Sequence, residues 1–223
     1  TQNLTPGNQF NRISTSNSIN RNQQQSFGST IDQKVTETFS YRFTPSLSWQ
    51  QTSSASADTT FTRSGLDPNS LDVTNRNTTA ATSISDAVNV SNNLLLRKKF
   101  AKKGRTISLV SDLNFNDKAQ DATLISENSF FDAANSPTFI EKVDQIKANQ
   151  QTTSSIASNL VYTEPLSEKS FLIFKYGLTV AKNDAERVTS NNNGPIVDSL
   201  SNHFVFNTVN NSGSLSYRYV AKK

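Results

Sequence analysis

The sequence contains no cysteine and no methionine, and it has only seven glycines and one histidine in 223 residues. Without cysteine there is no disulfide framework, no zinc–thiolate centre and no cysteine nucleophile. Its longest unbroken apolar run covers four residues, 171–174, whereas a membrane-spanning helix needs roughly 20. Charged residues make up 18% of the chain and the net charge is +4, without one long basic stripe. Nucleic acid is therefore not indicated as a partner.

Uncharged polar residues dominate the sequence instead, since 94 residues are Ser, Thr, Asn or Gln. The apolar residues among them alternate with polar ones, as in residues 41–49, where the odd positions are apolar or aromatic, and in 172–180, where the even positions are. A period of two is typical of β-strands, because successive side chains leave the backbone on opposite faces. The pattern predicts seven strands, at roughly 25–35, 39–54, 80–99, 106–123, 148–163, 170–187 and 200–220.

The connections between these strands alternate in length. Short turns are predicted near residues 36–38, 101–105 and 164–169, and longer polar segments at about 55–79, 124–147 and 188–199. Transmembrane β-barrels have this asymmetry of short turns on one rim and long loops on the other. Within the second long segment, Ile140, Val143 and Ile146 suggest a short helix over 138–148. Pro45 cannot donate to a ladder, so a bulge or a missing bond is expected there.

The two faces of the predicted strands differ in chemistry. Ser, Thr and Asn dominate the polar face, which suits a water-filled lumen better than the charged surface of a soluble domain. The apolar face carries aromatic residues near the short turns, as the interfacial girdles of membrane barrels do. We therefore predict that the apolar set faces lipid: Tyr41, Phe43, Leu47, Trp49, Leu94, Leu96, Ile107, Leu109, Leu113, Phe115, Leu160, Tyr162, Leu172, Phe174, Tyr176, Leu178, Val180, Leu215, Tyr217 and Tyr219.

Catalytic and metal-binding arrangements are weak in this sequence. The single histidine, His203, has no Gly-x-Ser-x-Gly elbow to accompany it, and we interpret it as a strand histidine. The acidic residues of the longer segments lack the spacing of a calcium loop, so no metal or cofactor is expected and the chain is not predicted to be an enzyme. Phe130 and Phe131 either pack in a loop cluster, which we favour, or contact a ligand. The basic residues around 97–105, with Lys222 and Lys223, either stay in water or contact anionic head groups.

Four stretches resemble a known family: residues 41–49 (YRFTPSLSW), 94–109 (LLLRKKF followed by KGRTISL), 162–171 (YTEPLS followed by SF) and 198–202 (DSLSN). They are similar to the large outer-membrane β-barrel proteins of Bacteroidetes, relatives of TonB-dependent receptors. That resemblance implies a barrel of about 22 strands with a plugged lumen, energised from the inner membrane. Here there is room for about seven strands and no recognisable plug or energy-coupling segment, and no functional residue is carried over.

The sequence thus predicts an all-β chain, an antiparallel up-and-down meander of about seven long strands that is part of a large transmembrane β-barrel. Residues 1–223 form one partial barrel domain, with residues 1–24 as a polar, poorly defined lead-in. The expected role is a wall segment of an outer-membrane receptor or transporter for nutrients. The alternative is a secreted all-β adhesin or carbohydrate-binding module, with its aromatics buried between two packed sheets. Expected partners are outer-membrane lipid, the remaining strands and plug of a longer chain, and a surface lipoprotein.

Overall fold

The computed structural model describes residues 2–5, 8–67 and 70–221. Nearly all of them lie in β-strands, and no helix in these ranges has the length and apolar character to span a membrane. The strands are β1 (Gln2–Thr5), β2 (Asn8–Gly28), β3 (Ile31–Lys34), β4 (Phe39–Asp67), β5 (Ser70–Lys99), β6 (Thr106–Phe131), β7 (Pro137–Pro165), β8 (Ser170–Asn191) and β9 (Asn202–Tyr219), with the 3-10 helix η1 (Asp198–Leu200) before β9.

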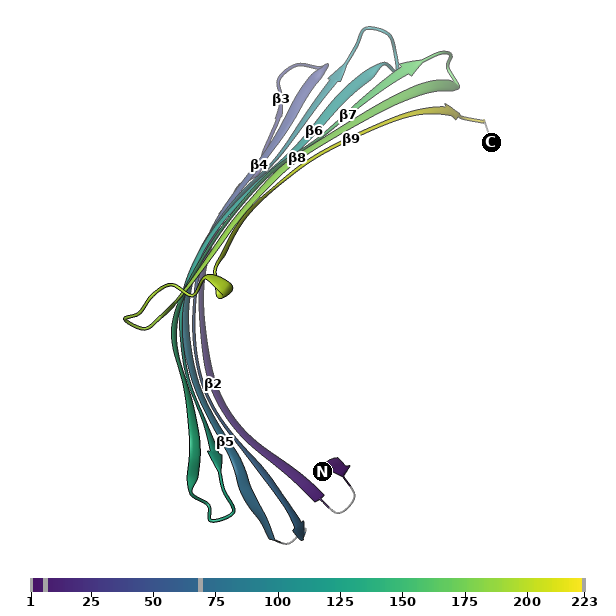
Figure 1. The fold of residues 1–223 in the computed structure, drawn as a ribbon. Coiled ribbons are helices and arrows are strands. Elements are labelled where there is room, and N and C mark those ends of the chain that lie inside the picture. The colour runs from purple at the N-terminus through teal and green to yellow at the C-terminus, as the bar shows by residue number, and fades with distance from the viewer. Residues whose placement is uncertain (1, 6–7, 68–69, 222–223) are drawn as a thin grey trace.

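All strands belong to one antiparallel sheet in the order β1-β2-β4-β5-β6-β7-β8-β9, and β3 pairs with β4 beside β2. Each long strand is therefore hydrogen-bonded to its neighbour in the sequence, which confirms the predicted all-β meander. Figure 1 shows a single curved layer whose first and last strands do not meet. The sheet is open rather than closed.

The strands are much longer than the alternation predicted. The expected loops at 55–79 and 124–147 are hairpin extensions, in which Ala57 pairs with Ala80 and Leu124 with Gln145. The predicted helix over 138–148 is also wrong, because these residues belong to β7. The apolar–polar contrast fades where both faces are polar, so the period-two signal ends although the ladder continues. In a strand, the even-numbered Ile140 and Ile146 lie on the face opposite Val143.

The N-terminal lead-in also differs from expectation. Residues 8–28 form β2, which pairs with β4 without interruption from Gln9 opposite Gly65 to Gly28 opposite Ser46. The strand predicted at 25–35 is divided between the end of β2 and β3. Of the third expected long segment, only residues 192–199 lie outside the long strands, and there Asn193 adopts a positive φ of 55° in a tight turn.

Pro45 explains why β2 and β3 are separate strands. Both pair with β4 in the same register, and the gap between them lies at Ser29 and Thr30. Ser29 donates its backbone N–H to the Pro45 carbonyl at 3.1 Å, but Pro45 has no N–H to return. The register of β4 against β5 is unbroken here, with Pro45 opposite Asn92. The expected defect is thus a missing bond rather than a bulge, and it affects only the β2–β3 side.

A Pro45→Val substitution is expected to restore that bond. The new N–H can donate to the Ser29 carbonyl, which adds about 0.5–1.5 kcal/mol to the free energy of unfolding. Val also suits a strand position. Hydrogen–deuterium exchange should show protection of the residue 45 amide and slower exchange at Ile31 and Asp32. Unchanged exchange in β3 would contradict the role given to Pro45.

The described part of the sheet has no hydrophobic core. Among the residues for which side-chain burial is described, the buried ones are Thr60, Ser129, Pro165 and Thr189, and none of them has a large aliphatic or aromatic side chain. Phe174 and Tyr217 are 45% and 62% exposed. The second layer expected for an adhesin or carbohydrate-binding sandwich does not occur in the described part of the chain, where all strands share one sheet.

The loop before β9 identifies the concave face of the sheet. Thr189 donates its hydroxyl hydrogen to the Leu200 carbonyl, and its backbone N–H donates to the hydroxyl of Ser201. In Figure 1 the 3-10 helix lies on the hollow side of the curved sheet. The face that carries Thr189 is therefore the concave one, called here the inner face. The opposite, convex face is the outer face.

Candidate functional site

The strand register brings the predicted lipid-facing residues together on the outer face. Residues that pair directly across an antiparallel ladder share a face. Phe43 pairs with Leu94, Tyr162 with Phe174, and the pattern continues strand by strand from β4 to β9. All twenty predicted residues fall on this one face: Tyr41, Phe43, Leu47 and Trp49 on β4, Leu94 and Leu96 on β5, Ile107, Leu109, Leu113 and Phe115 on β6, Leu160 and Tyr162 on β7, Leu172, Phe174, Tyr176, Leu178 and Val180 on β8, and Leu215, Tyr217 and Tyr219 on β9.

Further apolar residues extend this set, which we call the apolar belt. Phe27 pairs with Leu47, Ile31 with Phe43, and Val209 with Val180. Phe27 and Ile31 lie in a weaker alternation of the sequence, whereas Val209 stands in a polar stretch and gives no signal alone. Val88, Val90 and Ile156 complete the same surface.

The belt crosses the strands obliquely. Its upper limit, toward the long hairpin ends, is Trp49 on β4 and Val180 on β8. Following the ladder from Val180 across the sheet leads to Pro45 on β4. The belt therefore ends four residues earlier on β8 than on β4, over four steps between neighbouring strands.

The opposite limit slants in the same direction. Following the ladder from Tyr41 on β4 across the sheet leads to Gly213 on β9, and from Phe39, two residues farther out on the same face, to Leu215. The belt on β9 continues to Tyr219, six or four residues farther. Both limits thus move by about one residue per strand. With a rise of ~3.3 Å per residue and ~4.8 Å between strands, the belt direction makes an angle of ~30–40° with the perpendicular to the strands. Strands of membrane barrels tilt by ~35–45°.

Most polar groups within the belt are paired with one another. The hydroxyls of Ser111 and Ser158 lie 3.0 Å apart on neighbouring strands, and the Tyr176 hydroxyl donates to the Asn211 side-chain oxygen at 2.7 Å. Asn92 differs from these pairs, because its buried side-chain oxygen has no hydrogen-bond partner. Pairing of this kind lowers the cost of placing polar groups in an apolar medium.

A charged cluster joins two short turns at the rim beside the belt. Arg105 donates two hydrogen bonds to the Glu164 carboxylate, at 2.7 and 2.8 Å, and Lys102 and the Tyr162 hydroxyl donate at 2.7 and 2.6 Å. Lys102 and Arg105 belong to the turn between β5 and β6, while Glu164 lies at the end of β7. The bonds from Arg105, then those from Lys102 and Tyr162, hold the pKa of the Glu164 carboxyl well below its usual range. Head-group contact by the other basic residues of this rim stays a prediction, and Lys222 and Lys223 lie outside the described residues.

Glu164 is expected to stay ionised in mildly acidic solution. A carboxyl whose pKa is lowered by folding stabilises the fold above its unfolded pKa of ~4.3, and this contribution disappears only as the pH falls through the lower, folded pKa. The carboxyl ¹³C signal of Glu164 should therefore not move between pH 7 and pH 4, and Arg105→Gln should shift its titration upward. A midpoint near pH 4.3 in the unsubstituted protein would be incompatible with this cluster.

The inner face is lined by hydroxyls and amides that bond across the strands. Ser54 and Ser83 are 2.8 Å apart, and Asn93 donates to Asp112 at 2.6 Å. Three hollows open on this face, of about 360, 300 and 320 Å³. The first and second share Lys118 and Gln120, and the second and third share Asn149, Arg187 and Asn202. They form one continuous groove, which we call the inner groove, above the level of the belt.

His203 and the aromatic residues of the long hairpins have ordinary structural surroundings. His203 lies on β9, and its Nε2 is 2.8 Å from the carboxylate of Asp184. Phe130 packs against Phe139 across the β6–β7 hairpin with ring centroids 5.9 Å apart, which agrees with the packing we favoured. No group of three acidic or histidine side chains in the described ranges is arranged to hold a metal ion.

Comparisons with known proteins add little to this geometry. No family model matches the chain, and no curated protein matches it. Among solved structures, the chain is similar to the translocator domain of the autotransporter NalP from Neisseria meningitidis, at 12% identity over 97% of this chain and 89% of that chain, with a TM-score of 0.12. A TM-score of that size carries no argument, so the proposals below depend on the residues of the chain itself.

Proposed function

We propose that this chain forms a section of the wall of an outer-membrane β-barrel in a Gram-negative bacterium, with the apolar belt against lipid and the inner face toward a water-filled lumen. The single observation that carries the proposal is the oblique apolar belt on the convex face of a one-layer sheet. A planar bilayer that cuts tilted strands would produce this slant.

The height of the belt supports the same proposal. From Tyr41 to Trp49 the strand rises ~26 Å, and at a tilt of ~30–40° this corresponds to ~20–23 Å along the membrane normal. Side chains extend that span toward the ~25 Å apolar band of outer-membrane barrels. Backbone groups of the central strands are satisfied by both neighbours, as a sheet in hydrocarbon requires.

The absence of a core among the described residues also favours lipid as the partner of this face. A soluble sheet of this size would bury its apolar face against a second layer. Here the face is open over six strands and convex, so another flat layer could cover it only in part. Lipid follows any convex surface.

The sheet edges define what must complete the wall. β9 has a ladder partner on one side only, and β1 and β2 lie at the other edge. Open edges are not tolerated in hydrocarbon, so we propose that further strands of a longer chain close the barrel around a plug. The resemblance to TonB-dependent receptor relatives favours nutrient uptake as the role. The hairpins that extend above the belt offer a surface for a partner lipoprotein.

Alternating spin labels on β6 test the orientation of the wall. Single cysteines replace residues 107–115 in turn in the full-length protein in lipid bilayers, and each label is measured with oxygen and with a water-soluble nickel chelate. Labels at Leu109 and Leu113 should be oxygen-accessible, and labels at Ser108 and Asp112 should be nickel-accessible. Equal nickel accessibility at odd and even positions would contradict the proposal that this sheet is a membrane wall. Oxygen access at the even positions and nickel access at the odd ones would show that the two faces are assigned the wrong way round.

A further inference from the structure

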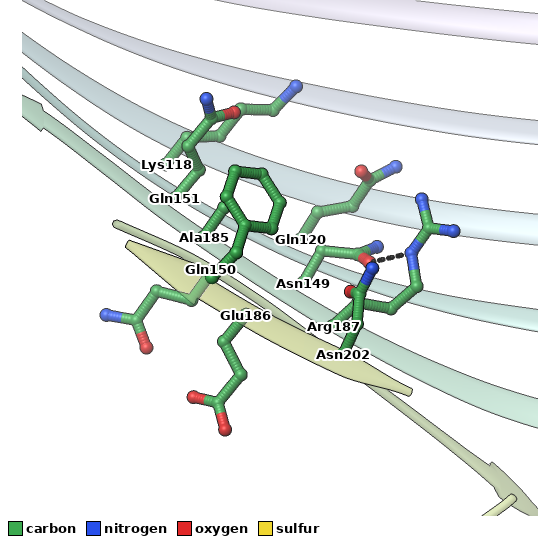
Figure 2. A pocket seen from close by; sticks show the side chains of 10 residues that line it. Lys118, Gln120, Asn149, Gln150, Gln151, Ala185, Glu186, Arg187 and Asn202 are labelled. Carbon is green, nitrogen blue, oxygen red and sulfur yellow. Dashed lines mark hydrogen bonds between the residues drawn. The ribbon is translucent and has the colours of Figure 1, made fainter. Parts of the chain in front are cut away.

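The inner groove is lined by three cationic side chains. Lys118, Lys147 and Arg187 all lie on the inner face, and within the described residues none of them forms an ion pair. Arg187 donates from its Nε to the Asn149 side-chain oxygen at 3.1 Å. The two terminal nitrogens of its guanidinium take no part in that bond. Figure 2 shows Lys118 and Arg187 on the same side of the sheet as Gln120 and Asn149.

Acidic strand residues at the same level lie on the other side of the sheet, whereas Asp198 of η1 adjoins Ser199, which lines the groove. Glu186 borders the groove in sequence, but Figure 2 shows its carboxylate directed away from the groove. The register places its acidic neighbours on the outer face as well. Along the strands of the three cations, the nearest inner-face carboxylates are those of Asp112 and Glu141, six residues from Lys118 and Lys147 respectively, or ~20 Å away. At the level of the groove the outer face carries Asp86, Asp117, Asp121, Asp184 and Glu186.

The backbone spacing of the three cations matches the repeat of an extended oligomeric anion. Arg187 is paired with Asn149, two residues from Lys147 on the neighbouring strand, which separates the two cations by ~8 Å. Lys118 lies two strands from Arg187 and two residues along, ~12 Å away, and ~14 Å from Lys147. These are separations of the Cα atoms, and the long Lys and Arg side chains can place their charges either on separate anionic groups or on a common one. An extended chain with an anionic side chain at every second residue has repeats of ~7 and ~13 Å.

We propose that the inner groove binds an extended oligomeric anion, with Lys118, Lys147 and Arg187 contacting successive anionic groups and Gln120, Asn149 and Asn202 hydrogen-bonding the neutral backbone between them. Binding is a property of the groove alone, whereas its place on an uptake route rests on the proposed function. A positive surface above the membrane would raise the local concentration of such a solute at the lumen entrance. This assigns an anionic oligomer as the class of solute.

Titration calorimetry of the full-length protein in neutral detergent tests the groove, with hexaglutamate as the probe, hexaglutamine as its neutral counterpart and inorganic phosphate as a single anion. Hexaglutamate should bind, and the affinity should fall at least about tenfold between 0.05 and 0.5 M salt because the attraction is screened. The Lys118→Gln and Arg187→Gln exchanges should each weaken binding about threefold, and about tenfold together. Lys175→Gln removes a cation from the inner face far from the groove, and should change the affinity less than twofold.

Several outcomes would overturn this site: no binding of hexaglutamate, equal binding of hexaglutamine, complete displacement by phosphate at equal concentration, or full affinity in the double variant. The single variants keep the test valid if the double variant does not fold. The result is separable from that of the spin labels. If the protein binds hexaglutamate but the label at Leu109 is accessible to the nickel chelate, the membrane-wall proposal is wrong and the groove proposal stands. If the label at Leu109 is accessible to oxygen but hexaglutamate does not bind, only the groove proposal is wrong.

Discussion

Leu178→Arg is expected to lower the free energy of unfolding of the full-length protein in lipid vesicles by about 2–4 kcal/mol, the cost of placing arginine near the bilayer midplane on the lipid face of a barrel. The belt on β8 runs from Leu172 to Val180, and Leu178 lies two residues, or ~7 Å along the strand, from its centre at Tyr176. Urea titration monitored by intrinsic fluorescence measures the loss. Because the cost depends on depth, arginine at Val180, on the upper limit, should cost less.

The matched control for this substitution is the adjacent residue. Thr179 pairs with Ala157 and Asn210 on the inner face, where water can hydrate a guanidinium. Thr179→Arg should therefore cost less than about 1 kcal/mol, close to the ordinary effect of a surface substitution. Equal losses at residues 178 and 179 would show that the two faces meet the same solvent, and would contradict the membrane orientation.

Gly104→Val is expected to destabilise the protein by about 2 kcal/mol. Gly104 has a φ of +88° in the turn between β5 and β6, a region that costs an L-residue roughly 1–2 kcal/mol and suits a β-branched residue least. A Cβ at this position would also lie 3.3 Å from the Phe171 ring. The same urea titration measures the effect, and a shift in the ¹³C signal of Glu164 would report that the neighbouring charged cluster has moved.

Gly213→Val provides the comparison for Gly104. A Cβ added at Gly213 meets nothing within 4 Å, and β9 is a strand in which valine is favoured over glycine. This variant should be neutral or more stable by up to about 1 kcal/mol. If both glycines tolerated valine equally, the strained turn would not be the reason for glycine at position 104.

The sequence predicts the faces of this protein better than its dimensions. Alternation in residues 41–49 and 172–180 is enough to place Phe43 and Phe174 on one face, because strand period two is a local property of the backbone. The lengths of β4 and β5 depend instead on the pairing between the two strands. Thr59 and Thr78 pair with each other, but no contrast between their two faces marks them in the sequence, so a ladder of Ser, Thr and Asn looks like a loop.

The slant of the belt and the inner groove could not be predicted for a different reason. Each depends on the register between strands, which no single segment encodes. Lys118, Lys147 and Arg187 are far apart in the sequence and alternate with acidic residues such as Asp117 and Glu186. Only the ladder separates these charges onto opposite faces.

The meander has a consequence for the order in which the wall is assembled. Each long strand finds its partner in the next segment of chain, so no pairing has to wait for a distant one, and the entropy of loop closure is small at every step. Hairpins can therefore form in sequence order, and the free backbone N–H and C=O groups of each newly formed edge strand pair with the strand that follows. Sheets that depend on local pairing nucleate faster than those with distant partners, and a growing wall of this kind can be extended from its edge without undoing what is already paired.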